Sequence, residues 1–201
     1  MDSKKLKNSY KLKQKEIKSR LKEFEKLKKR DMQKELMFCI LTPQSNAKRC
    51  WEAVEQISKL NKLEENKIKE ILKTKTRFHN NKTKYILESK EAWNKISPML
   101  TEQNRIELRN KLADNIKGYG LKEASHFLRN IGKSNNQIAI LDRHILRNLK
   151  AFKVIKEVKI KSRKDYLEKE QKYLNFAKQI GISPDALDLL FWSQENGEIF
   201  K

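Results

Sequence analysis

The chain has 201 residues, of which 47 are lysine or arginine and 26 are aspartate or glutamate, so its formal net charge is +21. A positive excess of this size favours a polyanionic partner such as nucleic acid, although a merely charge-rich cytosolic protein has the same composition. With only two cysteines, Cys39 and Cys50, the chain can build neither a disulfide framework nor a four-cysteine cluster, and its three histidines lack metal-ligand spacing, so we expect no metal site.

The first thirty residues predict a docked basic helix. They carry thirteen Lys or Arg residues against four acids, and they lack the apolar run of a signal peptide. No later apolar run is long enough to cross a bilayer, so we expect a cytoplasmic protein with no membrane partner. The basic face is either a solvated surface or a contact with phosphates. Apolar residues nevertheless recur at helical spacing, which indicates a helix packed on the rest of the chain: Tyr10, Ile17, Leu21, Phe24 and Leu27.

Helical periods follow one another through the middle of the chain. A buried helix over Leu36–Leu41 should end before Pro43, because the residue before a proline disfavours the helical conformation. Pro98 should end a later helix, and Asn104 should lead into the next one. Residues 77–81 read as a polar connection. We therefore expect helices over residues 36–41, 47–60, 64–75 and 83–96 and beyond Asn104.

One segment of the C-terminal third breaks this pattern. Residues 152–160, FKVIKEVKI, alternate in a way that is compatible with one extended stretch. Ser162 then opens a helix that Gly181 ends, and Ser183 with Pro184 opens the last one. With no internal repeat and no low-complexity linker, the sequence predicts a compact all-α protein.

The segment 118–132, GYGLKEASHFLRNIG, predicts a turn and a helix. Glycine tolerates positive φ and close backbone approach, so Gly118-Tyr119-Gly120 reads as a hairpin between two helices. Backbone N–H groups of the hairpin and of the following helix N-terminus can bind a phosphate. Alone, these features predict only non-specific DNA binding. The helix after the turn has an apolar face, with Lys122, His126 and Arg129 on its other face.

Two residues after the hairpin are candidates for chemistry. Lys122 stands in the first turn of a helix, where the macrodipole favours acids. A lysine there, partly desolvated against DNA, is suited to act as a nucleophile, and an ordinary solvated lysine is the alternative. Asp142 follows twenty residues later, after the apolar run 138–141. It can cap the next helix, and a cap at the mouth of a cleft can also act on a reacting sugar.

Together these residues resemble a known signature. Gly-Tyr-Gly-Leu-Lys followed by Asp142 is similar to the helix-hairpin-helix, Gly/Pro-rich loop and aspartate motif of a DNA glycosylase superfamily. KEASHFLRNIG and LDRHIL resemble the archaeal-type 8-oxoguanine DNA glycosylase/lyase family in particular, as do FCILTPQSNA, RFHNNK and LLFWSQENGEIFK. The resemblance runs from about Leu36 to Lys201. The spacing between Lys122 and Asp142 is longer than the family pattern, which lengthens the loop at residues 133–136.

The resemblance implies a fold and a mechanism. It implies two α-helical lobes with a central cleft, one of residues 31–134 with the helix-hairpin-helix and one of residues 1–30 plus 135–201. Lys122 would attack the sugar of an extruded nucleotide, and Asp142 would stabilise the positive charge that develops there. The resulting Schiff base permits β-elimination at the abasic site. No metal or redox cofactor is required, and the family pattern leaves room for an alkali ion at the hairpin carbonyls.

The resemblance also implies a base pocket. Phe78 and Trp192 would sandwich the flipped base, Gln44 would enter the gap in the duplex, and Lys201 would help to distinguish 8-oxoguanine from guanine. Each residue has an ordinary alternative: a core aromatic, a turn after Pro43 or an exposed basic end. The implied partner is double-stranded DNA containing 8-oxoguanine, which the protein would repair by base excision as a monomer.

Two other functions remain open at this point. An endonuclease III-like glycosylase for other oxidised bases has the same motif, but such enzymes typically carry a C-terminal iron–sulfur cluster, and this chain has no cysteine after Cys50. A non-catalytic helix-hairpin-helix DNA-binding protein would use the hairpin as a clamp. In that case Lys122 and Asp142 would be incidental.

Overall fold

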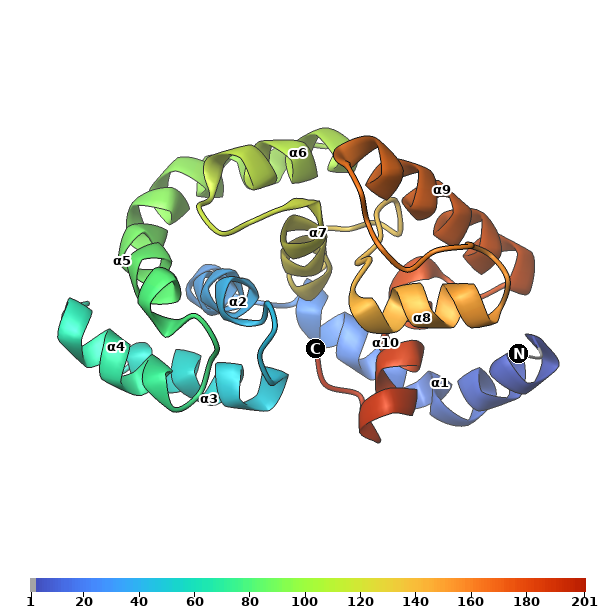
Figure 1. The fold of residues 1–201 in the computed structure, drawn as a ribbon, viewed down its shortest axis with the longest axis horizontal. Coiled ribbons are helices and arrows are strands. Elements are labelled where there is room, and N and C mark those ends of the chain that lie inside the picture. The colour runs from blue at the N-terminus through green and yellow to red at the C-terminus, as the bar shows by residue number, and fades with distance from the viewer. Residues whose placement is uncertain (1–2) are drawn as a thin grey trace. The chain divides into compact units, whose positions relative to one another are not determined.

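The computed structural model describes residues 3–201, which form ten α-helices, one 3-10 helix and no β-strand (Figure 1). The all-α prediction is confirmed. Contacts divide the chain into two units: Lys28–Phe127, and the residues up to Leu27 together with Leu128–Lys201. The chain passes from one unit to the other before α2 and within α7 (Leu121–Asn130). These boundaries are observed; the functional lobes expected at 31–134 and at 1–30 plus 135–201 stay a prediction.

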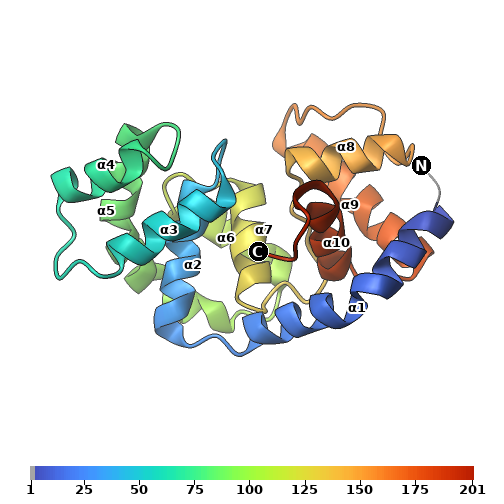
Figure 2. The ribbon, with the colours of Figure 1, turned by 90° about the horizontal axis from the view of Figure 1, so that it is seen from below.

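The unit Lys28–Phe127 is built around the buried helix α2 (Lys29–Leu41), which packs against α3 (Ala47–Ile57) and α5 (His79–Ile96) (Figure 2). Seven consecutive residues of α2, Glu35 to Leu41, are buried, so the apolar run predicted as a buried helix is confirmed. The other helices of the unit are α4 (Glu65–Lys73), the 3-10 helix η1 (Ser97–Thr101) and α6 (Arg105–Asn115).

The second unit contains α1 (Ser3–Glu25), which lies along α10 (Pro184–Asn196) (Figure 2). The helix α10 also packs against α8 (Arg143–Ala151) and α9 (Arg163–Ile180). The predicted docking of the basic N-terminal helix is confirmed, because Ile17 and Phe24 are buried. Leu6 is buried as well, whereas Tyr10, Leu21 and Leu27 are only half-buried.

Gly132 explains how the chain leaves α7. It has a φ of 66°, and a Cβ atom at this position would lie 2.6 Å from the Cα of Glu25. Only glycine has room for that approach, so the loop after α7 packs closely on the end of α1. The helix caps predicted further on are also seen: Ser162 Oγ accepts a hydrogen bond from Asp165 N at 3.1 Å, and Gly181 ends α9 in the left-handed conformation.

Two predicted segments are wrong. The connection expected at 77–81 is shorter, because α5 begins at His79 and the Lys82 N–H already donates to the Phe78 carbonyl. The polar first turn of α5 hides the helix from an apolar pattern. Residues 152–160 form turns and bends instead of an extended stretch. Lys153 has a φ of 61° there, and Val154 N donates to Leu149 O at 2.8 Å, so the segment closes the end of α8.

Candidate active site

The hairpin between α6 and α7 requires glycine at only one of its two glycine positions. Gly118 has a φ of 86°, and an added Cβ would stand 2.7 Å from Tyr85 Cδ2. Gly120 does not have a positive φ, and a Cβ there would meet only the flexible carboxylate of Glu123 at 3.3 Å. The predicted turn at Gly118-Tyr119-Gly120 thus lies between α6 and α7, and only Gly118 adopts the positive φ that glycine tolerates.

Tyr119 anchors the hairpin through its side chain. Its hydroxyl donates to the Leu36 carbonyl at 3.0 Å, and its ring meets Phe127 edge-on with centroids 6.4 Å apart. Burial raises the pKa of this phenol well above its usual value. Its backbone N–H donates to Ile116 O at 3.1 Å. The predicted phosphate contact of Gly118, Tyr119 and Gly120 stays a prediction, and the remaining donors are the first N–H groups of α7, which have no partner within the helix.

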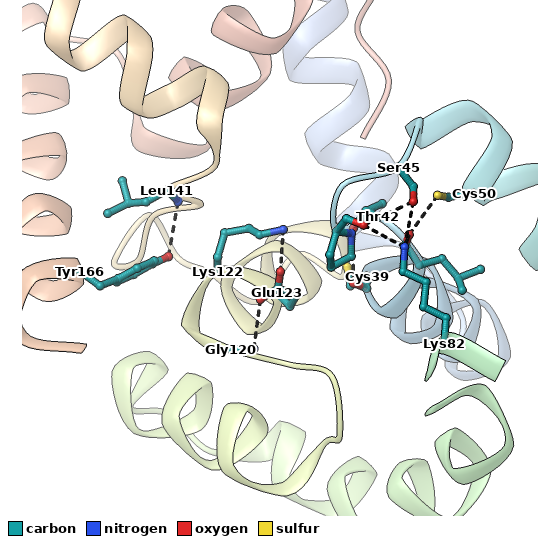
Figure 3. Close-up of polar contacts among 12 residues, drawn as sticks. Cys39, Thr42, Ser45, Cys50, Lys82, Gly120, Lys122, Glu123, Leu141 and Tyr166 are labelled. Carbon is teal, nitrogen blue, oxygen red and sulfur yellow. Dashed lines mark hydrogen bonds and ion pairs between the residues drawn. The ribbon is translucent and has the colours of Figure 1, made fainter. Parts of the chain in front are cut away.

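Lys122 is the second residue of α7, and Glu123 holds it. The Lys122 Nζ lies 2.7 Å from Glu123 Oε1, and both side chains are partly buried (Figure 3). The other oxygen, Oε2, accepts the Gly120 N–H at 3.0 Å (Figure 3). This is one half of a capping box, in which an acid at the third helical position reaches back to the N-cap. The sequence analysis missed Glu123, although its Gly-x-x-Glu spacing is the signal that identifies it.

Asp142 lies in the other unit, at the N-terminus of α8. Its Oδ1 accepts the Ile145 N–H at 2.8 Å, which confirms the predicted cap. The apolar run before it, 138–141, is buried and fixed by α9. Tyr166 OH donates to Ala139 O at 2.6 Å. The same hydroxyl accepts a hydrogen bond from the Leu141 N–H at 3.4 Å (Figure 3). The carboxylate of Glu170 accepts Ala139 N at 2.8 Å. The backbone that presents Asp142 is therefore held rigidly, whereas its expected apposition to Lys122 stays a prediction.

Gln44 and Phe78 share an unusual backbone conformation. Both are non-glycine residues with positive φ, 54° and 57° respectively. A bulky residue in this region is an outlier that costs about 1–3 kcal/mol, and such residues cluster at ligand-contacting sites. The Phe78 side chain is 53% exposed, and the Arg77 guanidinium lies 5.6 Å from its ring centroid. The core-aromatic alternative for Phe78 is therefore excluded, and its contact with a base stays a prediction.

Trp192 and Lys201 both belong to the C-terminal segment, which folds back on its own unit. Gly197 ends α10 with a φ of 83°, and Ile199 is buried. The rings of Trp192 and Phe200 lie 6.1 Å apart. The Lys201 ammonium sits 6.0 Å from the ring centroid of Phe24 on α1. The end of the chain is thus held in place, and the roles of Trp192 and Lys201 at a base stay predictions.

Two residues expected on the polar face of α7 are buried instead. Arg129 is 3% exposed and pairs with Asp188 at 2.9 Å, and its guanidinium stacks over Phe24. Burial raises the pKa of the Asp188 carboxyl to about 7, while Arg129 acts in the opposite direction. His126 packs its ring edge-on against Phe38. The pattern failed here because these polar side chains have buried partners that are far away in the sequence, Asp188 for Arg129 and Phe38 for His126.

Lys82 is a further buried cation that the sequence analysis did not single out. It lies on α5 with 4% of its surface exposed. Its Nζ donates to Leu41 O at 2.7 Å, to Pro43 O at 2.8 Å and to Ser45 Oγ at 2.9 Å (Figure 3). Burial lowers the pKa of this ammonium to about 8. No local sequence signal marks it, because its burial depends on the packing of α5 against α2.

Within residues 3–201, no group of three or more His, Cys, Asp or Glu side chains is placed to hold a metal ion. The expectation that the reaction needs no metal stays a prediction. None of the helices in this range is long and apolar enough to cross a membrane.

Comparison with known proteins places these features in a family. Residues 17–182 match the family described as 8-oxoguanine DNA glycosylase. A Fusobacterium nucleatum protein named 8-oxoguanine DNA glycosylase/AP lyase is 43% identical over 198 residues, 92% of this chain and 91% of that protein. A Thermoplasma volcanium protein of the same name is 38% identical over 180 residues, 89% of this chain and 86% of that protein.

Solved structures of proteins from the same family are similar to this chain over nearly its whole length. The 8-oxoguanine DNA glycosylase of Thermotoga maritima superposes with a TM-score of 0.90 at 32% identity, covering 99% of this chain and 98% of that one. The Methanocaldococcus jannaschii 8-oxoguanine glycosylase/lyase in complex with a 15mer DNA containing 8-oxoguanine superposes with a TM-score of 0.86 at 32% identity, covering 98% of this chain and 99% of that one. This chain therefore belongs to the 8-oxoguanine DNA glycosylase family.

Proposed function

We propose that this protein excises 8-oxoguanine from double-stranded DNA and then cleaves the strand at the abasic site, with Lys122 as the nucleophile. The observation that carries the proposal is the position of Lys122. It stands directly after the hairpin, in the first turn of α7, where its Nζ is held by Glu123 at 2.7 Å beside a helix N-terminus suited to phosphate. Membership of the family supports 8-oxoguanine DNA as the substrate, and the position of Lys122 supports its assignment as the nucleophile.

The reaction begins with extrusion of the damaged nucleotide, because a stacked base shields its own glycosidic bond. The unprotonated amine of Lys122 then attacks C1′ of the sugar. A bond forms between Nζ and C1′ as the glycosidic bond breaks. The base leaves with the bonding electrons and takes up a proton, while Nζ releases one to solvent. Opening of the sugar ring gives a Schiff base. The Schiff base acidifies the C2′ proton, the 3′-phosphate leaves by β-elimination, and hydrolysis restores Lys122.

Asp142 acts on the same sugar in this proposal. A carboxylate has about four lone-pair positions, so the cap to Ile145 N through Oδ1 leaves capacity for a second interaction. Its negative charge stabilises the cationic character of C1′ as the base leaves. Because Tyr166 and Glu170 fix the preceding backbone, the carboxylate acts from a rigid support. The proposal requires DNA to contact both units of the chain.

The base pocket is proposed from the exposed and strained residues. Phe78 stacks on the extruded base, and Trp192 stacks on its other face. Gln44, on a turn with positive φ, enters the gap that the base leaves. The protein acts as a monomer on cellular DNA in the cytoplasm, since one chain contains every residue that the mechanism uses.

Base release from duplexes of one sequence tests the function. A duplex with 8-oxoguanine, one with guanine and one with an oxidised pyrimidine should be incubated with the protein, followed by separate assays of base release and strand cleavage. We expect release and cleavage on the 8-oxoguanine duplex alone. Preference for the oxidised pyrimidine would favour the endonuclease III-like alternative, and binding without release would favour a non-catalytic clamp.

DNA affinity should fall steeply with salt. The net charge of +21 implies several phosphate contacts, and each contact releases counterions on binding. With about six contacts, the affinity for undamaged duplex should fall by about three orders of magnitude between 50 and 200 mM salt. Fluorescence anisotropy on a labelled duplex measures this slope. A flat titration over the same range would contradict an interface dominated by the DNA backbone.

Deleting Lys201 should reduce excision of 8-oxoguanine much more than binding to undamaged duplex. The lesion differs from guanine by an N7–H donor and the C8 oxygen, so an acceptor placed at N7 favours one base and repels the other. The docked C-terminal segment, with Ile199 buried and Phe200 beside Trp192, fixes the position of the last residue.

A second variant separates the two parts of this residue. Lys201→Ala removes the lysine side chain and keeps the terminal carboxylate near its place. The deletion removes the side chain and also shifts the carboxylate to Phe200. Single-turnover excision by the deletion variant at the wild-type rate would remove the terminus from the site.

A further inference from the structure

Lys82 is buried in the helical core, and burial of a charged ammonium is unfavourable unless polar groups compensate for the lost hydration. Lys82 is 4% exposed, and burial of its ammonium lowers its pKa to about 8 because the charged form loses its hydration. An ammonium has three N–H donors. All three find acceptors within 2.9 Å, on Leu41, Pro43 and Ser45. The side chain is therefore committed to one short stretch of chain.

That stretch is the turn that carries Gln44. Leu41 O is at the C-terminal end of α2, where helix carbonyls lack intrahelical donors and the macrodipole is negative. Pro43 O and Ser45 Oγ lie on either side of Gln44, whose φ is 54°. The Lys82 ammonium thus bridges the end of α2 and both flanks of Gln44, which holds this residue in a conformation that it does not favour by itself.

The same lysine reaches the turn that carries Phe78. Its backbone N–H donates to Phe78 O at 3.1 Å. Ser45 Oγ, which accepts from Lys82 Nζ, also accepts the Arg77 N–H at 2.9 Å. Two left-handed residues that are far apart in the sequence, Gln44 and Phe78, are therefore tied together through Lys82 and Ser45.

We propose that Lys82 is a positioning residue for base recognition, which fixes Gln44 and Phe78 relative to each other through Ser45. The inference rests on the function proposed for this site, because it assigns both residues to the flipped base and the gap that it leaves. A misplacement of about 1 Å in a positioning group can lower a rate about 100-fold. Loosening this junction should therefore impair recognition of the base without removing the nucleophile.

A comparison of two substrates distinguishes an effect on base recognition from an effect on the covalent reaction of Lys122. An abasic duplex has no damaged base to recognise, yet Lys122 forms the Schiff base on it and β-elimination follows. Lys82 should therefore matter for 8-oxoguanine excision and not for cleavage of a preformed abasic site. Lys82 also lies close enough to Lys122 for the two charges to interact. An effect transmitted through that charge would lower both activities together, which distinguishes it from positioning.

The test uses Lys82→Met, which keeps the length of the side chain and removes the three donors. The matched control is Lys84→Met, which removes an exposed lysine from the same helix. We expect Lys82→Met to lower single-turnover excision of 8-oxoguanine about 100-fold, with abasic-site cleavage unchanged. Lys84→Met should leave both rates unchanged. A parallel loss of both activities in a folded Lys82→Met protein, or no loss of either, overturns the proposal.

Ser45→Ala gives a second, smaller perturbation, in case Lys82→Met does not fold. It removes the shared oxygen that links Arg77 N to Lys82 Nζ and leaves both lysines in place. Excision should fall about 10-fold, since one link of the junction is lost, while abasic-site cleavage persists. Losses of the same size on both substrates, or wild-type rates on both, would overturn the proposed link through Ser45. Absence of excision by the wild-type protein would instead reject the proposed function.

Discussion

Lys122→Gln should abolish both release of 8-oxoguanine and borohydride trapping of the protein on DNA. Glutamine keeps a similar length and polarity, but its amide has no basic lone pair with which to attack C1′ or form a Schiff base. Binding to lesion DNA should be largely retained, because one charge among 47 basic residues contributes little to the interface. Gel analysis of the reduced reaction mixture measures trapping, and anisotropy measures binding.

The chain offers a matched control on the same hairpin. Lys117 is exposed and pairs with Glu88 at 3.0 Å, outside the first turn of α7. Lys117→Gln removes the same charge and should leave trapping unchanged. Covalent trapping of Lys122→Gln at the wild-type level would show that another amine is the nucleophile.

Asp142→Asn should keep the fold and lose most of the turnover. Asparagine caps helices as well as aspartate does, so the hydrogen bond to Ile145 N, 2.8 Å in this structure, has an equivalent acceptor in the variant. The amide lacks the negative charge that stabilises the sugar cation, and loss of one such electrostatic contact costs about 100-fold or more in rate. Thermal unfolding and single-turnover excision measure the two properties separately.

Asp142→Ala completes the comparison, because it removes the charge and the cap together. Loss of an N-cap costs about 1 kcal/mol, so this variant should lose stability as well as turnover. If Asp142→Asn loses stability and retains the wild-type rate, capping is the whole role of Asp142.

Local signals in the sequence predicted the helices and their ends well. The caps and helix ends at three predicted positions depend only on neighbouring residues, so they could be recognised without tertiary information: Asp142, Ser162 and Gly181. The prediction of an extended stretch at residues 152–160 was wrong. The N–H groups of residues 152–154 donate to carbonyls in the last turns of α8, and an apolar alternation cannot distinguish such a helix end from a strand.

The site was predicted only in part, because much of it depends on contacts between distant segments. Lys122 was identified by its place after the hairpin, and its partner Glu123 had a recognisable capping spacing. Neither Lys82 nor Tyr166 is marked by a local sequence pattern. Lys82 is one of 47 basic residues, and only the packing of α5 on α2 reveals that its ammonium is enclosed. Tyr166 holds the backbone before Asp142, but it lies on α9, which begins only at Arg163.

The identity of the residue attached to DNA tests the central claim most directly. The wild-type protein should be trapped with borohydride on a duplex containing 8-oxoguanine, digested with a protease and a nuclease, and sequenced by tandem mass spectrometry. We predict that the reduced sugar remnant is attached to Lys122 Nζ and to no other lysine. Attachment to Lys82, or to another amine outside the first turn of α7, would contradict the account.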